Sequence, residues 1–193
     1  MNDVMVFLEG KFFASRLNEM KLLCQMEVSY MVGIDSFFPD IEDIPNLIEE
    51  FSKLLRWKRG NVRVLLEEIK ENFILCLMVI DNDVDALKVV PKLKREEYKR
   101  LLKIGFNFDK LSRSYWRKKT IKPNEELKGS DLEFFIGKGT EYVVDNIYGK
   151  IKELMLLYEI DKENPNIQWD RRIRNLHKRI LILMGHLQGY SQR

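Results

Sequence analysis

The chain has 193 residues, of which 45% are hydrophobic and 33% charged, and its formal net charge at pH 7 is +3. This composition excludes a disordered or a disulfide-rich protein and is that of a globular protein with a sizeable core. The longest apolar run, over 73–80, is far shorter than the about 20 residues needed to span a bilayer. The first ten residues carry an acidic residue where a secretory signal is basic. We therefore predict an intracellular protein, cytoplasmic or nuclear, with no membrane partner and with two free cysteines.

In the first half of the chain, nearly every periodic segment has the spacing of a helix. Apolar stripes predict helices over 11–31 and about 45–57, separated by a proline-containing loop. Residues 62–80 are predicted to form one helix that becomes apolar all round. A helix to about residue 72, followed by a buried strand over 73–80, is the alternative.

The second half is predicted to continue with short helices and then two long ones. In chain order we expect helices at about 83–90, 94–105 and 108–118, a linker at 119–130, a helix capped by Ser130, and long helices at about 140–160 and 164–187. Asn164 and Pro165 suit the N-cap and the first position of the last helix. A short loop joins the two long helices, so we expect an antiparallel pair.

These elements predict an all-α protein, a bundle of about six to eight helices. An N-terminal helical region with an acidic loop would occupy 1–60 and the main bundle 61–193, or both would form a single domain.

The charges are distributed unevenly along the chain. Residues 33–52 carry six acids and no base, 92–119 carry eleven bases and three acids, and 171–193 carry six bases and no acid. Such segregation predicts an anionic partner, either nucleic acid or an acidic protein, or association in a homodimer or a larger complex.

The last predicted helix contains the stretch QWDRRIRNLHKR, over 168–179. At 100° per residue, one arc of the helix is apolar and forms the expected core face: Trp169, Ile173, Leu176, Ile180, Leu183, Met184 and Leu187. Arg171, Arg174 and Lys178 lie on the opposite side. This outer face is either a solvated surface or a surface that binds phosphates.

Within the same stretch, Arg172 and His177 form an R-x4-H pair that resembles the signature of the HEPN family of helical RNases. The resemblance implies a dimer that brings two copies of the pair together to cut RNA. The polar residue that tends to follow the Arg in that family is Ile173 here. On a helical wheel Arg172 and His177 lie about 140° apart, on opposite sides of the apolar stripe.

Two further basic stretches contain aromatic residues. One consists of Arg56, Lys58 and Arg59 around Trp57, and the other contains Arg113, Trp116, Arg117, Lys118 and Lys119. Aromatic rings among cations can stack on exposed bases while the cations neutralise phosphates. Alternatively, each tryptophan buries one face in the core and the cations are solvated.

An opening segment gives a second family resemblance. Residues 30–39 (YMVGIDSFFP), Ile44-Pro45 and the basic segment 56–63 are similar to the opening of one class of GINS replication-complex subunits. The resemblance implies a subunit of a larger assembly. That family's opening domain is rich in strands, whereas residues 11–31 here have helical spacing.

No metal or cofactor is predicted. Asp81, Asp83 and Asp85 match the start of a calcium loop, but its sixth and twelfth positions do not follow. His177 and His186 lie on different faces of one helix and have no nearby cysteine. We therefore expect a non-enzymatic, nucleic-acid-associated or assembly subunit, with the RNase as the alternative and a scaffold subunit as a further one.

Overall fold

The computed structural model describes residues 44–56, 58–112, 119–123 and 127–188. Within these ranges the regular structure is helical apart from one isolated bridge between Thr120 and Gly139, which confirms the all-α class. The elements are α2 (Ile44–Arg56), α3 (Gly60–Ile80), α4 (Ala86–Val89), α5 (Glu96–Lys103), α6 (Thr140–Asp161) and α7 (Trp169–Gln188), with 3-10 helices η2 (Val90–Lys92), η3 (Phe108–Leu111) and η4 (Glu133–Phe135). The helix predicted over 11–31 lies outside the described residues, so the total of six to eight helices stays a prediction.

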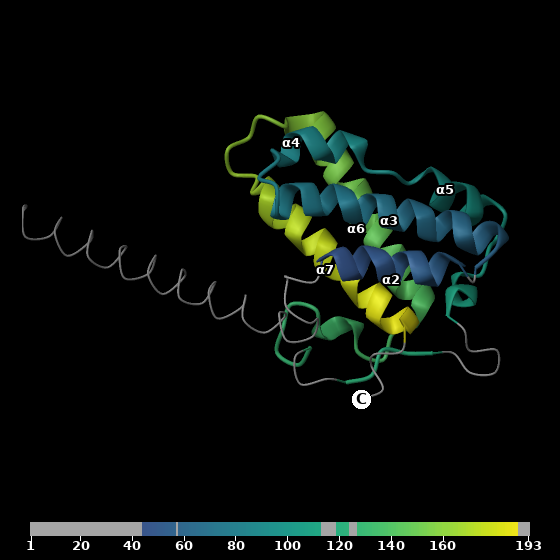
Figure 1. Ribbon diagram of the computed structural model, residues 1–193. Helices are drawn as coiled ribbons and strands as arrows, with labels where there is room; N and C mark the ends of the chain where they lie inside the picture. The colour runs from purple at the N-terminus through teal and green to yellow at the C-terminus, as the bar shows by residue number, and fades with distance from the viewer. Residues whose placement is uncertain (1–43, 57, 113–118, 124–126, 189–193) are drawn as a thin grey trace, which may run out of the picture.

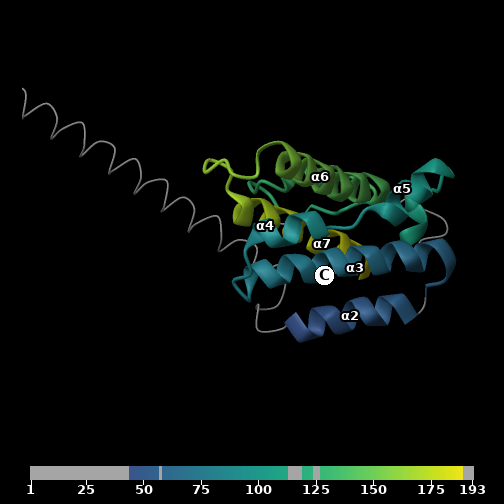
Figure 2. The same cartoon turned by 90° about the horizontal axis from the view of Figure 1, so that it is seen from above.

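α3 and α7 occupy the centre of the arrangement (Figure 1). α7 packs against both α3 and α6, and α2 packs against α3. Seen from above, α2 and α6 lie on opposite sides of α3 (Figure 2). α7 begins beside the C-terminal end of α3 and runs back toward the turn between α2 and α3. In both views α7 stops well short of that turn, so only its first residues lie beside an end of α3 (Figures 1 and 2).

α3 is a single helix, as predicted, and the alternative of a strand over 73–80 is wrong. Its Phe73 ring is buried and lies 5.4 Å, centroid to centroid, from Phe51 of α2. Cys76 is a buried free thiol, and burial raises its pKa above the ordinary range. The prediction of a free cysteine is thus confirmed for Cys76, whereas Cys24 lies outside the described residues.

Two polar side chains of α3 hold the segment that leads into α5. Asn72 is fully buried; its amide donates to the Lys94 carbonyl at 2.8 Å and its Oδ1 accepts from the Lys94 N–H at 2.7 Å. Glu68 accepts from the backbone N–H groups of Glu97 at 2.7 Å and Tyr98 at 3.2 Å. These N–H groups lie in the first turn of a helix, where no intrahelical carbonyl is in reach. A carboxylate of α3 therefore caps α5 in place of a neighbouring residue.

The linker predicted at 119–130 is packed against the molecule. Ile121 and Leu127 are buried. The Ile121 N–H donates to the Lys138 carbonyl at 2.9 Å, and the Gly137 N–H donates to the Ile121 carbonyl at 2.8 Å. The described part of this segment thus forms a short backbone pairing beside the start of α6.

Two of the predicted short helices are only 3-10 turns in the described residues. The helix predicted over 108–118 is the 3-10 turn Phe108–Leu111 as far as the described residues extend. Ser130 does accept a bond from the Leu132 N–H at 3.2 Å, as a cap would, but only the 3-10 turn Glu133–Phe135 follows it.

The predicted start of the last helix at Asn164 is wrong, because α7 begins at Trp169. The Ile167 N–H donates to the Asn164 carbonyl at 3.1 Å, and Asn164 Oδ1 accepts from the Asn166 N–H at 2.9 Å. Asn followed by Pro is favoured at the first two positions of such a turn as well as at a helix start. The same residue pair therefore forms a turn here.

The seven residues predicted as the core face of α7 are all buried. The second half of the helix is also buried on its other sides, at Leu181, Ile182 and His186, which the apolar stripe did not predict. Among the helices described, none has both the length and the apolar character required to cross a membrane.

Candidate nucleic-acid interface

The first half of α7 carries the predicted basic face. Arg171 is exposed, and Arg174 and Lys178 are half-buried. The helix contains five Lys and Arg residues and a single acid, Asp170. Burial raises the pKa of Asp81 at the end of α3, and the positive charge of Arg174 opposes that rise. Arg174 therefore lies close enough to the end of α3 to act on this carboxyl group.

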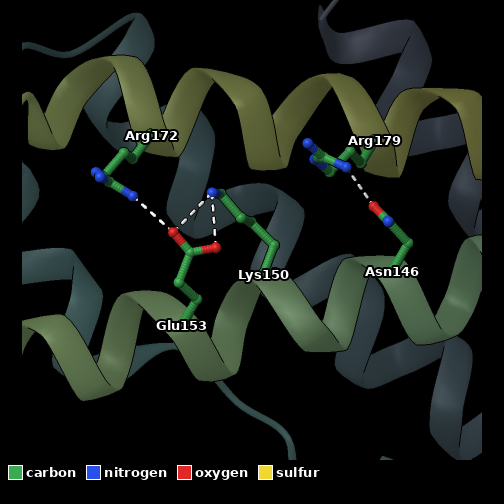
Figure 3. A network of polar contacts seen from close by, with 5 residues as sticks. All are labelled: Asn146, Lys150, Glu153, Arg172 and Arg179. Carbon is green, nitrogen blue, oxygen red and sulfur yellow. Dashed lines mark hydrogen bonds and ion pairs between the residues drawn. The ribbon is translucent and has the colours of Figure 1, made fainter. Parts of the chain in front are cut away.

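Two other arginines of α7 point toward α6 (Figure 3). Arg172 Nη1 donates to Glu153 Oε1 at 2.7 Å, and Lys150 Nζ donates to both carboxylate oxygens of Glu153, at 3.0 and 2.8 Å. Arg179 donates to Asn146 Oδ1. Burial raises the pKa of Glu153, but the bonds from Lys150 and Arg172 outweigh burial and the net shift is downward. We call these five residues the α6–α7 seam; two cations share one carboxylate in it, so the seam has excess positive charge.

The histidine of the R-x4-H pair faces away from this seam. The His177 ring stacks on Phe73 of α3, with centroids 4.9 Å apart and planes at 17°. Its Nε2 is buried without a hydrogen-bond partner among the described residues, and burial lowers its pKa to about 4, helped by Arg174. Since Arg172 contacts α6, the two side chains have different helices as neighbours. For proton transfer near neutral pH, His177 would have to leave Phe73 and regain an ordinary pKa.

The turn between α2 and α3 displays two of the predicted cations. Arg56 and Arg59 are exposed. Between them, Lys58 Nζ donates to the Leu111 carbonyl at 2.8 Å. Gly60 begins α3 with a φ of +57°, in the left-handed region that favours glycine. The turn is thus tied to the 3-10 segment that contains Leu111, and Arg56 and Arg59 remain at the surface.

Lys119 has a structural contact rather than a free position at the surface. Its Nζ donates to the backbone carbonyl of His186, in the last turn of α7, where carbonyls lack intrahelical partners. Burial, and then the charge of Lys122, lowers the pKa of Lys119. The ring of His186 is buried, with Nε2 2.9 Å from Thr140 Oγ1, and burial lowers its pKa to about 4. The other predicted residues of this stretch lie outside the described part of the chain: Arg113, Trp116, Arg117 and Lys118.

The predicted cations that the structure describes at the surface fall into two groups. Arg56 and Arg59 lie where α3 begins, whereas Arg174 lies near its end. α3 has 21 residues. At ~1.5 Å per residue, the two groups are separated by roughly 30 Å along this helix. Arg171 and Lys178 belong with Arg174, so these residues form two surfaces rather than one.

A group of aromatic and basic residues at the start of α6 was not predicted from the sequence. Phe134 and Tyr142 are 40% and 41% exposed, and the buried Phe135 lies 4.3 Å from the first ring and 6.1 Å from the second. The Arg179 guanidinium lies 5.5 Å from the centroid of Phe134, and Lys138 Nζ lies 5.0 Å from that of Tyr142. We call Phe134, Lys138, Tyr142 and Arg179 the aromatic–basic cluster. The spacing of four between Phe134, Lys138 and Tyr142 was the available signal.

No set of three or more His, Cys, Asp or Glu side chains in the described ranges could hold a metal ion. Asp85, which belonged to the calcium-like spacing, instead caps α4 by accepting from the Leu87 N–H at 2.9 Å. Comparison of the chain with protein-family models, with curated proteins and with solved structures found no match. The chemistry of the described surfaces is therefore the basis for a functional proposal.

Proposed function

We propose that the protein is a non-enzymatic helical subunit that binds RNA or DNA through the basic face of α7. Arg56 and Arg59 at the α2–α3 turn form a second contact. The mechanism is electrostatic, because Lys and Arg side chains neutralise phosphates and release counterions, and it requires no reading of base sequence.

The observation that carries this proposal is the charge imbalance of α7, with five Lys and Arg residues against one acid. Its two histidines add no charge at neutral pH, since both have a pKa of about 4. Arg171, Arg174 and Lys178 span eight residues of helix, a rise of ~10 Å. This length corresponds to about three phosphates of one strand at ~3.4 Å each. Two of the three cations of this face are arginines, whose planar fork fits phosphate better than an ammonium does.

Fluorescence anisotropy with a labelled single-stranded oligonucleotide tests the proposal. The triple variant Arg171→Gln, Arg174→Gln and Lys178→Gln should bind at least tenfold more weakly than the unaltered chain at low salt. The matched control changes three exposed lysines that lie outside the proposed interface: Lys92→Gln, Lys99→Gln and Lys152→Gln. Equal losses in both variants would show that only net charge matters and would overturn the assignment to α7.

The proposal extends to parts of the chain beyond these surfaces. Arg113, Arg117 and Lys118 are proposed as further phosphate contacts, with Trp116 stacking on a base. For the whole chain we propose a bundle of about six to eight helices whose last two form an antiparallel pair, acting within a homodimer or a larger complex.

A further inference from the structure

We infer that Phe134 and Tyr142 stack against the bases of single-stranded nucleic acid, while Lys138, Arg179 and the α6–α7 seam take its phosphates. This inference rests on the proposed function and names the class of nucleic acid and a second surface that binds it.

The two rings are more exposed than aromatic side chains usually are. Phe134 and Tyr142 are 40% and 41% exposed, although aromatic side chains of this size are mostly covered in a folded chain. Phe135 is fully buried and lies against both rings. Contact with Phe135 holds both rings in place, so that little conformational entropy of these side chains is lost when a ligand binds.

The cations held beside the rings indicate the kind of ligand. Arg179 lies over both Phe134 and Phe135, at 5.5 and 5.9 Å from the ring centroids, and a hydrogen bond to Asn146 holds it there. Lys138 lies 5.0 Å from the centroid of Tyr142. An apolar protein side chain on these rings would have to remove water from two positive charges, which is costly. A nucleotide offers both a flat ring and a negative charge, so it suits both parts of the cluster.

The seam continues the same surface along α6. Tyr142, Asn146, Lys150 and Glu153 recur at spacings of three and four, so they form one stripe on the helix. The twelve residues from Tyr142 to Glu153 cover about 16 Å, the length of roughly five stacked nucleotides. Along this line Lys138, Arg179, Lys150 and Arg172 are positive.

Two acids lie close to this line. Glu153 is ion-paired with Lys150 and Arg172, and Asp131 lies near enough to raise the pKa of Arg179 in part, against the larger lowering by burial. The four cations of the line outnumber these two acids, and this excess favours an anion. A duplex would not offer its bases to Phe134 and Tyr142, because they are stacked within the helix. Single strands are therefore the class that the cluster suits.

The experiment compares two oligomers of about 12 nucleotides, one with bases and one abasic, at equal phosphate number. The variant Phe134→Leu with Tyr142→Leu keeps apolar packing but removes both π-faces. We expect its affinity for the base-bearing strand to fall at least about tenfold and its affinity for the abasic strand to stay unchanged. Tyr158→Leu is the matched control, because Lys162 lies 5.9 Å from that ring at the opposite end of α6.

The possible outcomes distinguish base stacking from purely electrostatic binding and from a disturbed fold. A loss that is selective for the base-bearing strand supports the stacking role. If the unaltered chain binds both oligomers equally and the variant does too, stacking is excluded while electrostatic binding by α7 stands. An equal loss of affinity for both oligomers also overturns the stacking role, since the substitutions would then have disturbed the fold. A lower melting temperature of the same sample would show this. Binding of neither oligomer overturns the proposed function and this inference together.

Discussion

The two histidines of α7 make a prediction about acid sensitivity. Burial lowers the pKa of both His177 and His186 from an ordinary 6.5 to about 4. Between these values the unfolded chain binds more protons than the folded one, so the free energy of unfolding falls as the pH falls. The stabilisation is fully present above about pH 6.5 and is lost as the pH drops toward about 4.

The expected magnitude is large for a small protein. Between about pH 7 and pH 5, each histidine costs the folded state ~2 kcal/mol, or ~4 kcal/mol together. Small domains have only about 5–15 kcal/mol in total. At ~2–4 °C per kcal/mol for a chain of this size, the melting temperature should fall by roughly 8–16 °C.

Urea unfolding at a series of pH values, followed by circular dichroism, measures this dependence. The His177→Phe variant keeps an aromatic ring against Phe73 and leaves the shifted carboxyls of Asp81 and Glu153 in place. It should lose about half of the pH dependence and stay within about 1 kcal/mol of the parent chain at neutral pH. A parent chain whose stability is the same at both pH values, or a variant with the full dependence, would refute the reasoning from burial.

Two further predictions concern single polar contacts. Replacing the buried Asn72 by Ala removes both bonds to Lys94 and should lower the free energy of unfolding by about 2–4 kcal/mol. Asn175→Ala on α7 is the control and should change it by less than ~0.5 kcal/mol. Equal effects in urea melts would contradict a stabilising role for the two Asn72 bonds. Lys119→Met should lower stability but leave nucleic-acid affinity nearly unchanged, because its ammonium contacts the end of α7, and Lys178→Met should do the reverse. Anisotropy and thermal melts on both variants check this. If only Lys119→Met weakened binding, Lys119 would contact nucleic acid and not the His186 carbonyl.

Local patterns in the sequence predicted the helical elements well where contacts are local. The apolar spacing over 62–80 predicted α3, because a helix that buries most of its surface needs no alternation of polar residues. The core stripe of α7 followed from 100° per residue in the same way. The burial of His186 could not be predicted, because its contacts with Lys119 and Thr140 come from distant parts of the chain.

The candidate site was predicted in part. Counting charges found the basic face of α7, because charge excess is a property of the sequence itself. It also selected Lys58 and Lys119, whose ammonium groups bond to carbonyls that are 53 and 67 residues away. The residues next to a lysine in the sequence cannot show whether its ammonium bonds to a distant carbonyl or lies at the surface. For the same reason Phe134 and Tyr142 were missed, since only the fold brings Arg179 to them.

The salt dependence of oligonucleotide binding tests the central claim most directly. In a plot of the logarithm of the association constant against that of the salt concentration, Arg171, Arg174 and Lys178 together should contribute about −2 to the slope for a single strand. The slope should become less negative by about 2 when all three are replaced by Gln, because the other proposed contacts remain. A flat response in the parent chain, or no binding at low salt, would contradict the account.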